Sequence, residues 1–194
     1  IENSRLTTNH LNFDNKKNLY LIDGPSNYTK EDLNLYFENG RYNSKSKKGF
    51  FSNNNYLKDD DFILQSEILI TDEENNIEAI DNVSLVNEEE KIFINSGYAT
   101  LNDSSRYFTK KPKISFLNKD DTLNINSEIV FSKKNILISH KDVKIISNNL
   151  IGKCDSLSFN QNDSLIKLYG SPIIWIDGYQ VTSDVIILKY FDNE

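Results

Sequence analysis

Turn-forming clusters recur along the whole 194-residue chain, and they constrain its fold more than any other feature. Asn, Asp, Ser and Lys concentrate in them, as in DNKKN at 14–18, NEEEK at 87–91 and NQND at 160–163. Asn and Asp tolerate left-handed backbone and bond their own main chain, so such clusters end strands. The segments between them are about 10–12 residues long and rich in Ile, Val, Phe, Tyr and Thr. This pattern predicts roughly a dozen strands and almost no helix.

An internal repeat of about 30 residues orders these strands. One series places a small residue before an acidic residue or Gly in most repeats. Its members are Asn9, Asn39, Ser66, Ser96, Ser127, Cys154 and Ser183. A second series interleaves with the first and places all three prolines at one repeat position. Its members are Pro25, Asn55, Val83, Pro112, Val143 and Pro172.

Each repeat therefore holds two strands joined by short polar turns, and short turns join antiparallel neighbours. A two-stranded unit cannot bury its apolar face alone, whereas stacked units can. The sequence predicts an all-β fold, an elongated antiparallel β jelly-roll built of two-strand repeats of about 30 residues. We expect residues 1–194 to form a single repetitive domain that is a segment of a longer chain.

Alternation within the strands predicts a long apolar wall on the inner side of two facing sheets. If the sheets splay apart, the space between them becomes a groove that could hold acyl chains. The predicted wall consists of Leu64, Ile68, Ile70, Ile94, Ile114, Phe116, Leu123, Ile125, Ile129, Phe131, Val143, Ile145, Ile174 and Ile176. A filled core and a lipid groove give the same sequence pattern, and the pattern alone favours the filled core.

Composition excludes several classes of function. The net charge is −7 with both signs mixed along the chain, which argues against nucleic-acid binding through a basic face. No apolar run approaches the roughly 18 residues of a membrane-spanning helix. A single cysteine leaves no internal disulfide. The segment begins at Ile1 without a signal peptide in view.

Few residues suggest catalysis or metal binding. Cys154 and Asp155 could form a nucleophilic pair with His140, but Cys154 occupies a position that Ser fills in other repeats. His10 and His140 are isolated, so no metal site is predicted. A row of carboxylates spaced by about one repeat suggests structural hydrogen bonding more than a glycosidase pair. Its members are Glu67, Glu128, Asp155 and Asp184. We therefore expect neither an enzyme nor a cofactor.

The repeats resemble those of the OstA-like family, to which the periplasmic lipopolysaccharide-transport protein LptA is related, and most closely the longer OstA-like proteins of the Bacteroidetes type. The resemblance rests on three stretches, GKCDSLSF at 152–159, LYGSPIIWIDGYQVTSDVI at 168–186 and FTKKPKISFLNKDDTLNINSEIV at 108–130. It is strongest from about 92 to 190, and before residue 40 YLIDGPSNY at 20–28 is its best piece.

The resemblance implies a bent jelly-roll, called a β-taco, that stacks end to end across the periplasm and performs no chemistry. Lipopolysaccharide would pass along it with its lipid A acyl chains in the apolar groove. Partners would be other jelly-roll domains or a second copy, joined by strand addition at sheet edges. The alternative is a structural or adhesin-like β-repeat protein with a dry core. A polysaccharide lyase or hydrolase on a β-helix fits less well, because β-helix rungs are shorter than about 30 residues.

Overall fold

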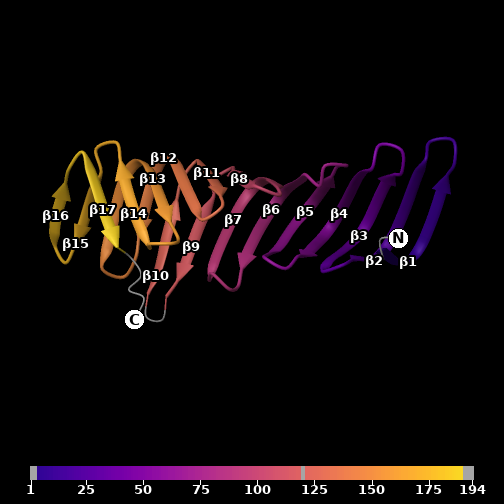
Figure 1. The fold of residues 1–194 in the computed structure, drawn as a ribbon, viewed down its shortest axis with the longest axis horizontal. Coiled ribbons are helices and arrows are strands. Elements are labelled where there is room, and N and C mark those ends of the chain that lie inside the picture. Colours follow the sequence, from indigo (N-terminus) through magenta and orange to yellow (C-terminus); the bar gives the residue numbers. More distant parts are fainter. Residues whose placement is uncertain (1–3, 119–120, 190–194) are drawn as a thin grey trace. The chain divides into compact units, whose positions relative to one another are not determined.

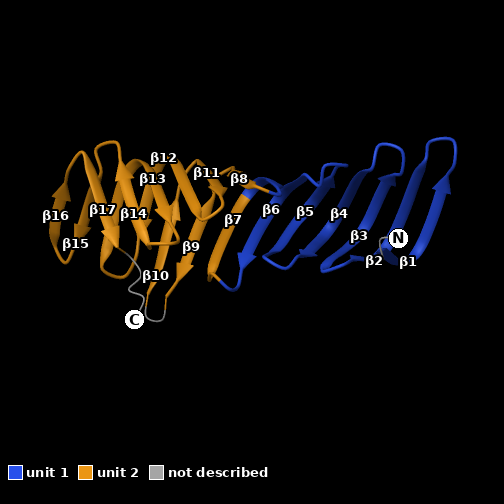
Figure 2. Ribbon diagram, in the orientation of Figure 1, with its two compact units in different colours: residues 1–89, 97–103 blue, residues 90–96, 104–194 orange. Residues whose placement is uncertain are grey.

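The computed structural model describes residues 4–118 and 121–189. These residues form seventeen antiparallel strands and no helix (Figure 1), which confirms the predicted all-β class. By internal contacts the chain divides into two units (Figure 2). Unit 1 contains residues 1–89 and 97–103, and unit 2 contains residues 90–96 and 104–194. Each unit is described below by itself. That the whole chain forms one domain stays a prediction.

Unit 1 consists of long strands that each pair with the next strand along the chain. They are β1 (Ser4–Asp14), β2 (Leu19–Lys30), β3 (Leu33–Asn43), β4 (Lys48–Lys58), β5 (Ile63–Thr71), β6 (Ile77–Asn87) and the last part of β7 (Ile92–Asn102). The register shifts once near the middle of every pairing from β1–β2 to β5–β6, for example between Ser52 and Asn55. Each such shift is a β-bulge, which bends the strand and divides the sheet into two halves.

Unit 2 has the same plan, with several strands interrupted at the position of the bulge. Its strands are the start of β7, β8 (Ser105–Thr109), β9 (Lys113–Leu117), β10 (Thr122–Asn126), β11 (Ile129–Lys133), β12 (Ile136–Ile146), β13 (Leu150–Asn160), β14 (Leu165–Tyr169), β15 (Ile173–Ile176), β16 (Tyr179–Thr182) and β17 (Val185–Lys189). The first half-sheet joins β8, β11, residues 136–140, residues 156–160, β14 and β17. The second half-sheet joins residues 92–95, β9, β10, residues 143–146, residues 150–154, β15 and β16.

The two half-sheets of unit 2 face each other across an apolar interior. Phe116 of β9 belongs to the second half-sheet, and Phe159 of β13 belongs to the first. Their ring centroids lie 4.7 Å apart in an edge-to-face arrangement. Both side chains are buried. Aromatic contact between the halves shows that the strands fold over on themselves, as the β-taco form of a jelly-roll requires.

Pairs of residues with positive φ form the corner where the strands fold over. The pairs are Asn53–Asn54, Asp81–Asn82, Lys110–Lys111, Lys141–Asp142 and Gly170–Ser171. Each directly precedes a member of the second repeat series, which is buried in every case. Asn, Asp and Gly accept this backbone most readily and fill six of the ten positions, whereas Lys110, Lys111, Lys141 and Ser171 adopt it against that preference.

The structure corrects the first members of both repeat series. Pro25 is exposed, and the buried residue after Gly24 is Ser26. Ser26 pairs with Thr8 on one side and with Phe37 on the other. Thr8 and Phe37 therefore replace the predicted Asn9 and Asn39, and the three prolines do not share one position. Pro112 and Pro172 alone are equivalent and buried.

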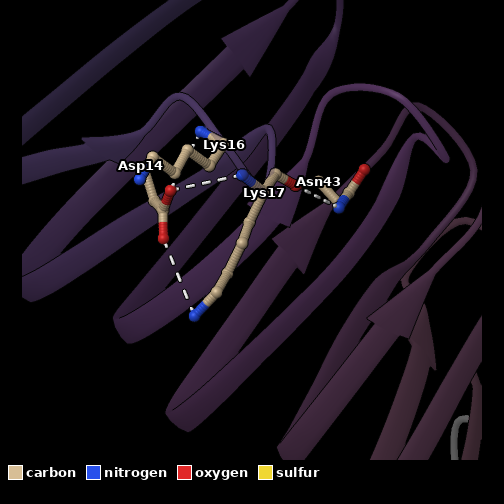
Figure 3. A network of polar contacts seen from close by, with 4 residues as sticks. All are labelled: Asp14, Lys16, Lys17 and Asn43. Carbon is tan, nitrogen blue, oxygen red and sulfur yellow. Dashed lines mark hydrogen bonds and ion pairs between the residues drawn. The ribbon is translucent and has the colours of Figure 1, made fainter.

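The turns confirm the prediction made from the polar clusters. In the first turn, Asp14 Oδ1 accepts hydrogen bonds from the backbone N–H groups of Lys16 at 3.0 Å and Lys17 at 3.2 Å (Figure 3). Asn43 Nδ2 donates to the Lys17 carbonyl at 3.1 Å and ties this turn to the next. Asn18 completes the turn with a φ of 52°. A short polar side chain that bonds its own backbone therefore ends the strand.

Candidate functional site

The apolar interior of each unit is the candidate site. Nine of the predicted wall residues are buried in it. They are Leu64, Ile94, Ile114, Phe116, Leu123, Ile125, Val143, Ile145 and Ile174. Ile176 lies on the same face as Ile174, which stands two residues before it on β15, and it pairs with Leu150 of β13 and Tyr179 of β16. Its side chain is half-buried. Whether these residues bind lipid stays a prediction.

Four predicted wall residues lie on the outer face instead. Ile68, Ile70, Ile129 and Phe131 are half-buried, and the residues between them, Leu69 and Val130, have no exposed surface. At the bulge two residues of the second-series strand, such as Asn53 and Asn54, lie opposite one residue of the first-series strand, Glu67. The first-series strand therefore runs from buried Ser66 to buried Leu69, and its alternation changes phase there. The predicted faces assumed strict alternation without a bulge. They are therefore wrong for the residues that follow Ser66 and Ser127 along their strands.

The residue three positions after each first-series residue points inward and was missed. In the later repeats these residues are Leu69, Ala99, Val130, Leu157 and Ile186, all of them buried. Their apolar character recurs with the repeat, so an alignment of the repeats at this position could have found them. Gly40 holds the same place in an earlier repeat, where a side chain would collide with the Phe37 ring.

Small residues before the bulge have a structural reason. Ser66 Oγ donates to the Ile68 carbonyl at 3.0 Å, and Ser127 Oγ donates to the Ile129 carbonyl at 3.1 Å. The hydroxyl therefore pairs a carbonyl that the bulge removes from the ladder. Phe37 fills the equivalent position on β3 and contacts Phe51 with ring centroids 4.7 Å apart.

The interior of unit 2 is closed between its half-sheets, and in each unit the inward row ends in exposed side chains at a terminal strand. Ile114, Ile125 and Ile145 have no exposed surface. In unit 1 the inward-facing Leu11 and Phe13 of β1 are 52% and 43% exposed. In unit 2 the inward-facing Tyr179 and Val181 of β16 are 74% and 42% exposed. Apolar inward rows thus end, at β1 and at β16, in side chains that are accessible to a ligand or another protein.

Two polar atoms in the interior lack a hydrogen-bond partner among the described residues, Asn55 Oδ1 and Ser139 Oγ. The Asn55 amide nitrogen donates to the carbonyls of Glu67 at 2.9 Å, Ser66 at 3.2 Å and Phe51 at 3.3 Å. It therefore pairs two carbonyls at the corner of the neighbouring strand β5 and one carbonyl of its own strand β4. The Oδ1 atom of Asn55 is buried without a partner, which offsets part of the stabilisation that these hydrogen bonds provide.

Cys154 has the environment of a core residue. It points into the interior opposite Val143, whereas His140 is exposed and pairs with Ser156. The structure therefore does not bring this thiol and this imidazole together on one face. Burial raises the pKa of Cys154 to about 11, so the thiol is protonated at neutral pH. A protonated thiol is a poor nucleophile.

The predicted carboxylate row lies at the exposed corner of the strands and supports the corner of the next strand. Glu67 Oε1 accepts from Asn82 Nδ2 at 3.2 Å, and Glu38 accepts from Asn54 in the same way at 2.8 Å. The Asp155 carboxylate lies against Gly170, where no side chain would fit. These acidic residues therefore face the positive-φ pairs.

Metal ligands do not gather in the part of the chain that the structure describes. Its residues contain no group of three or more His, Cys, Asp or Glu side chains placed to hold a metal ion. His10 and His140 are both exposed and lie in different units. Within the same residues, no helix is long and apolar enough to span a bilayer.

Comparison with known proteins gives a structural likeness and no sequence match. No family model matches the sequence, and no curated protein matches it. Among solved structures, the chain is similar to LptH of Pseudomonas aeruginosa, described as the LptA-homologous periplasmic component of the lipopolysaccharide transport device. The match covers 96% of this chain and 94% of LptH, with 8% sequence identity and a TM-score of 0.43.

Proposed function

We propose that this protein is a periplasmic component of a lipopolysaccharide-transport bridge, and that it holds acyl chains between its two half-sheets without performing catalysis. The observation that carries the proposal is the apolar interior whose inward rows end in exposed Leu11, Phe13, Tyr179 and Val181. The sequence motifs that resemble the OstA-like family support the same function. Among the described residues, the reactive side chains have structural roles at the corner or in the core.

An acyl chain would enter at a terminal strand and part the half-sheets as it advances. Each methylene buried contributes about 0.8 kcal/mol, and the apolar contacts between the half-sheets that it replaces cost a similar amount. Binding would therefore be close to balanced along the interior. A carrier that must release its cargo to the next module needs this balance.

Edge strands provide the means of assembly. β1 pairs only with β2, and β16 pairs only with β15, in the part of the chain that the structure describes. Backbone groups on an unpaired strand edge accept another strand. We expect another jelly-roll domain or a second copy to add there, which would also cover the exposed inward side chains.

The second candidate is a structural or adhesin-like repeat with a dry core. It is favoured by the complete burial of Ile114, Ile125 and Ile145 and by the contact between Phe116 and Phe159. A core at ordinary packing density leaves no room for an acyl chain unless the half-sheets move apart.

Site-specific photocrosslinking distinguishes the two candidates. A small aliphatic diazirine residue would be placed inward at Ile114, Ile145 or Ile174, and outward at Ile138 or Ser158 as controls. Lipopolysaccharide adducts at inward positions and none at outward positions would support transport. Equal labelling on both faces, or none at inward positions while the protein remains folded, would favour the dry core.

A further inference from the structure

The outer face of the second half-sheet in unit 2 combines apolar and basic side chains. Its members come from five strands, β7, β9, β12, β13 and β15, and point away from the buried row that contains Ile114, Ile125 and Ile145. The apolar members are Phe93, Leu117, Ile146, Ile151, Ile173 and Trp175, and the charged members are Lys113, Lys144 and Lys153. We call this set the lysine–apolar face.

The three lysines form one row across the sheet. Asn126 pairs with both Lys113 and Lys144, and Lys144 pairs with Lys153. Like charges directly opposite each other on a sheet are destabilising. Asp142 Oδ2 lies 3.6 Å from Lys144 Nζ and offsets part of this repulsion. Lys113 and Lys153 make no ion pair with another described residue, so two of the three charges are available to a partner.

An apolar row runs beside the lysine row. Ile146 pairs with Ile151, and Ile151 pairs with Trp175. Ile146 is 45% exposed and Ile151 is 53% exposed, so two neighbouring aliphatic side chains project into water. Trp175 is half-buried, and its Nε1 donates to Gln180 Oε1 at 3.1 Å. The indole therefore presents an apolar body with a satisfied polar end.

The outward positions of residues 92–95, 113–117, 122–126, 143–146, 150–154 and 173–176 hold no carboxylate, and Asp142 of β12 and Asp155 of β13 border this face. The protein has 29 acidic residues and a net charge of −7. Those nearest the face lie at the corner or in turns, at Glu128, Asp142, Asp155, Asp121 and Asp177. The face therefore carries positive charge, although the protein as a whole is negative. An anionic partner is attracted to this face and repelled by the rest of the surface, which sets the orientation of binding.

We propose that the lysine–apolar face docks on the surface of an anionic phospholipid bilayer. Tryptophan and isoleucine side chains insert at the boundary between headgroups and acyl chains, and lysines beside them reach the lipid phosphates. An acidic protein would satisfy the lysines but leave the exposed row of Ile146 and Ile151 without a matching ligand unless it also offered apolar side chains. The inference does not depend on lipid binding in the interior, because the face lies on the outside of the half-sheet.

The opposite outer face of unit 2 provides an internal contrast. It also carries apolar side chains, such as Tyr107, Phe131 and Ile138, which lie in one paired row. Its lysines are scattered: Lys133 and Lys189 lie at opposite ends of one row, separated by Ile136, Asn160 and Leu165, and Lys167 lies in the apolar row itself. Only a continuous basic row beside an apolar row gives the spatial separation that an interface between headgroups and acyl chains requires.

Trp175 is the only tryptophan in the chain, so its fluorescence reports on this face directly. The protein would be mixed with vesicles of phosphatidylglycerol and phosphatidylcholine, or of phosphatidylcholine alone, and binding followed by sedimentation and by Trp175 emission. The test variant is K113Q/K144Q/K153Q, and the charge-matched control is K45Q/K47Q/K133Q, whose lysines are exposed elsewhere. A second test variant, I146S/I151S, removes the apolar row.

We expect binding that needs phosphatidylglycerol, weakens with salt and shifts the Trp175 emission to the blue. Each lysine removed should lower the partition coefficient about fivefold, so the triple variant should lose on the order of 100-fold relative to its control. Absence of binding to anionic vesicles, or equal binding by the test and control variants, would overturn the proposal. Tight binding to soluble polyglutamate with none to vesicles would overturn it in favour of an acidic protein partner.

Discussion

The change of alternation at the bulge predicts which of two neighbouring residues is buried, and strict alternation predicts the opposite. Leu69 has no exposed surface, whereas its neighbour Ile70 is half-buried on the outer face of the same strand. Leu69→Ala removes about three carbons from a packed interior, and such changes cost about 2–5 kcal/mol. Ile70→Ala removes a similar volume from a surface that water already reaches, so we expect a loss of about 1 kcal/mol or less.

Urea unfolding followed by circular dichroism measures both variants against the unchanged protein. The difference between them should be at least about 1 kcal/mol, or more than about fivefold in the unfolding equilibrium constant. Val130→Ala and Ile129→Ala form the same test in unit 2, because Val130 is fully buried and Ile129 is not. Equal losses for Leu69 and Ile70, or a larger loss for Ile70, would show that the bulge does not change the phase of the strand.

Three further predictions concern buried polar and titratable groups. Asn55→Ala should destabilise the protein by about 2–3 kcal/mol in the same urea assay, because three carbonyls at the bulge lose their donor; a change below about 0.5 kcal/mol would contradict that role. Ser139→Ala should leave stability unchanged or raise it by about 1 kcal/mol, because its hydroxyl is buried without a partner, and a clear loss would indicate a partner such as a buried water. Burial raises the pKa of Cys154 to about 11, so the thiol should resist alkylation at pH 8 until urea unfolds the protein. For the same reason, the free energy of unfolding should fall as the pH rises from the ordinary thiol pKa of 9.0 towards 11. Cys154→Ser should weaken that alkaline dependence, which Tyr98 shares because burial also raises its pKa. Fast alkylation of the folded protein would refute the burial.

The strands, turns and repeat could be predicted from the sequence because their causes are local. Asp14 and Asn43 bond their own backbone and end strands wherever they stand. Likewise, Val143 and Ile145 alternate with Lys144 on a strand segment without a bulge, and their inward positions follow directly.

The faces beyond the bulge could not be predicted by alternation alone. A bulge depends on pairing between strands, and a sequence pattern within one strand does not show how many residues oppose each partner. Ile68 and Phe131 were therefore placed on the wrong face. Pro25 was misplaced by one residue for a similar reason, since its likeness to Pro112 and Pro172 is in chemistry and not in register.

Whether the interior is closed also lies beyond sequence patterning. Ile125 would alternate with Asn124 and Asn126 in the same way if it lined a groove or a packed core. The structure shows it fully buried. Lipid binding therefore requires the half-sheets to move apart. It depends on the free energy of that movement, which residue types alone do not give.

Photocrosslinking at two neighbouring residues of β12 tests interior lipid binding most directly. Leu137 points into the interior and is 3% exposed, and Ile138 lies beside it on the outer face. The same aliphatic diazirine residue would be placed at each position and irradiated with lipopolysaccharide. The account predicts strong labelling through position 137 and little through position 138. Equal labelling, or labelling through position 138 alone, would contradict it.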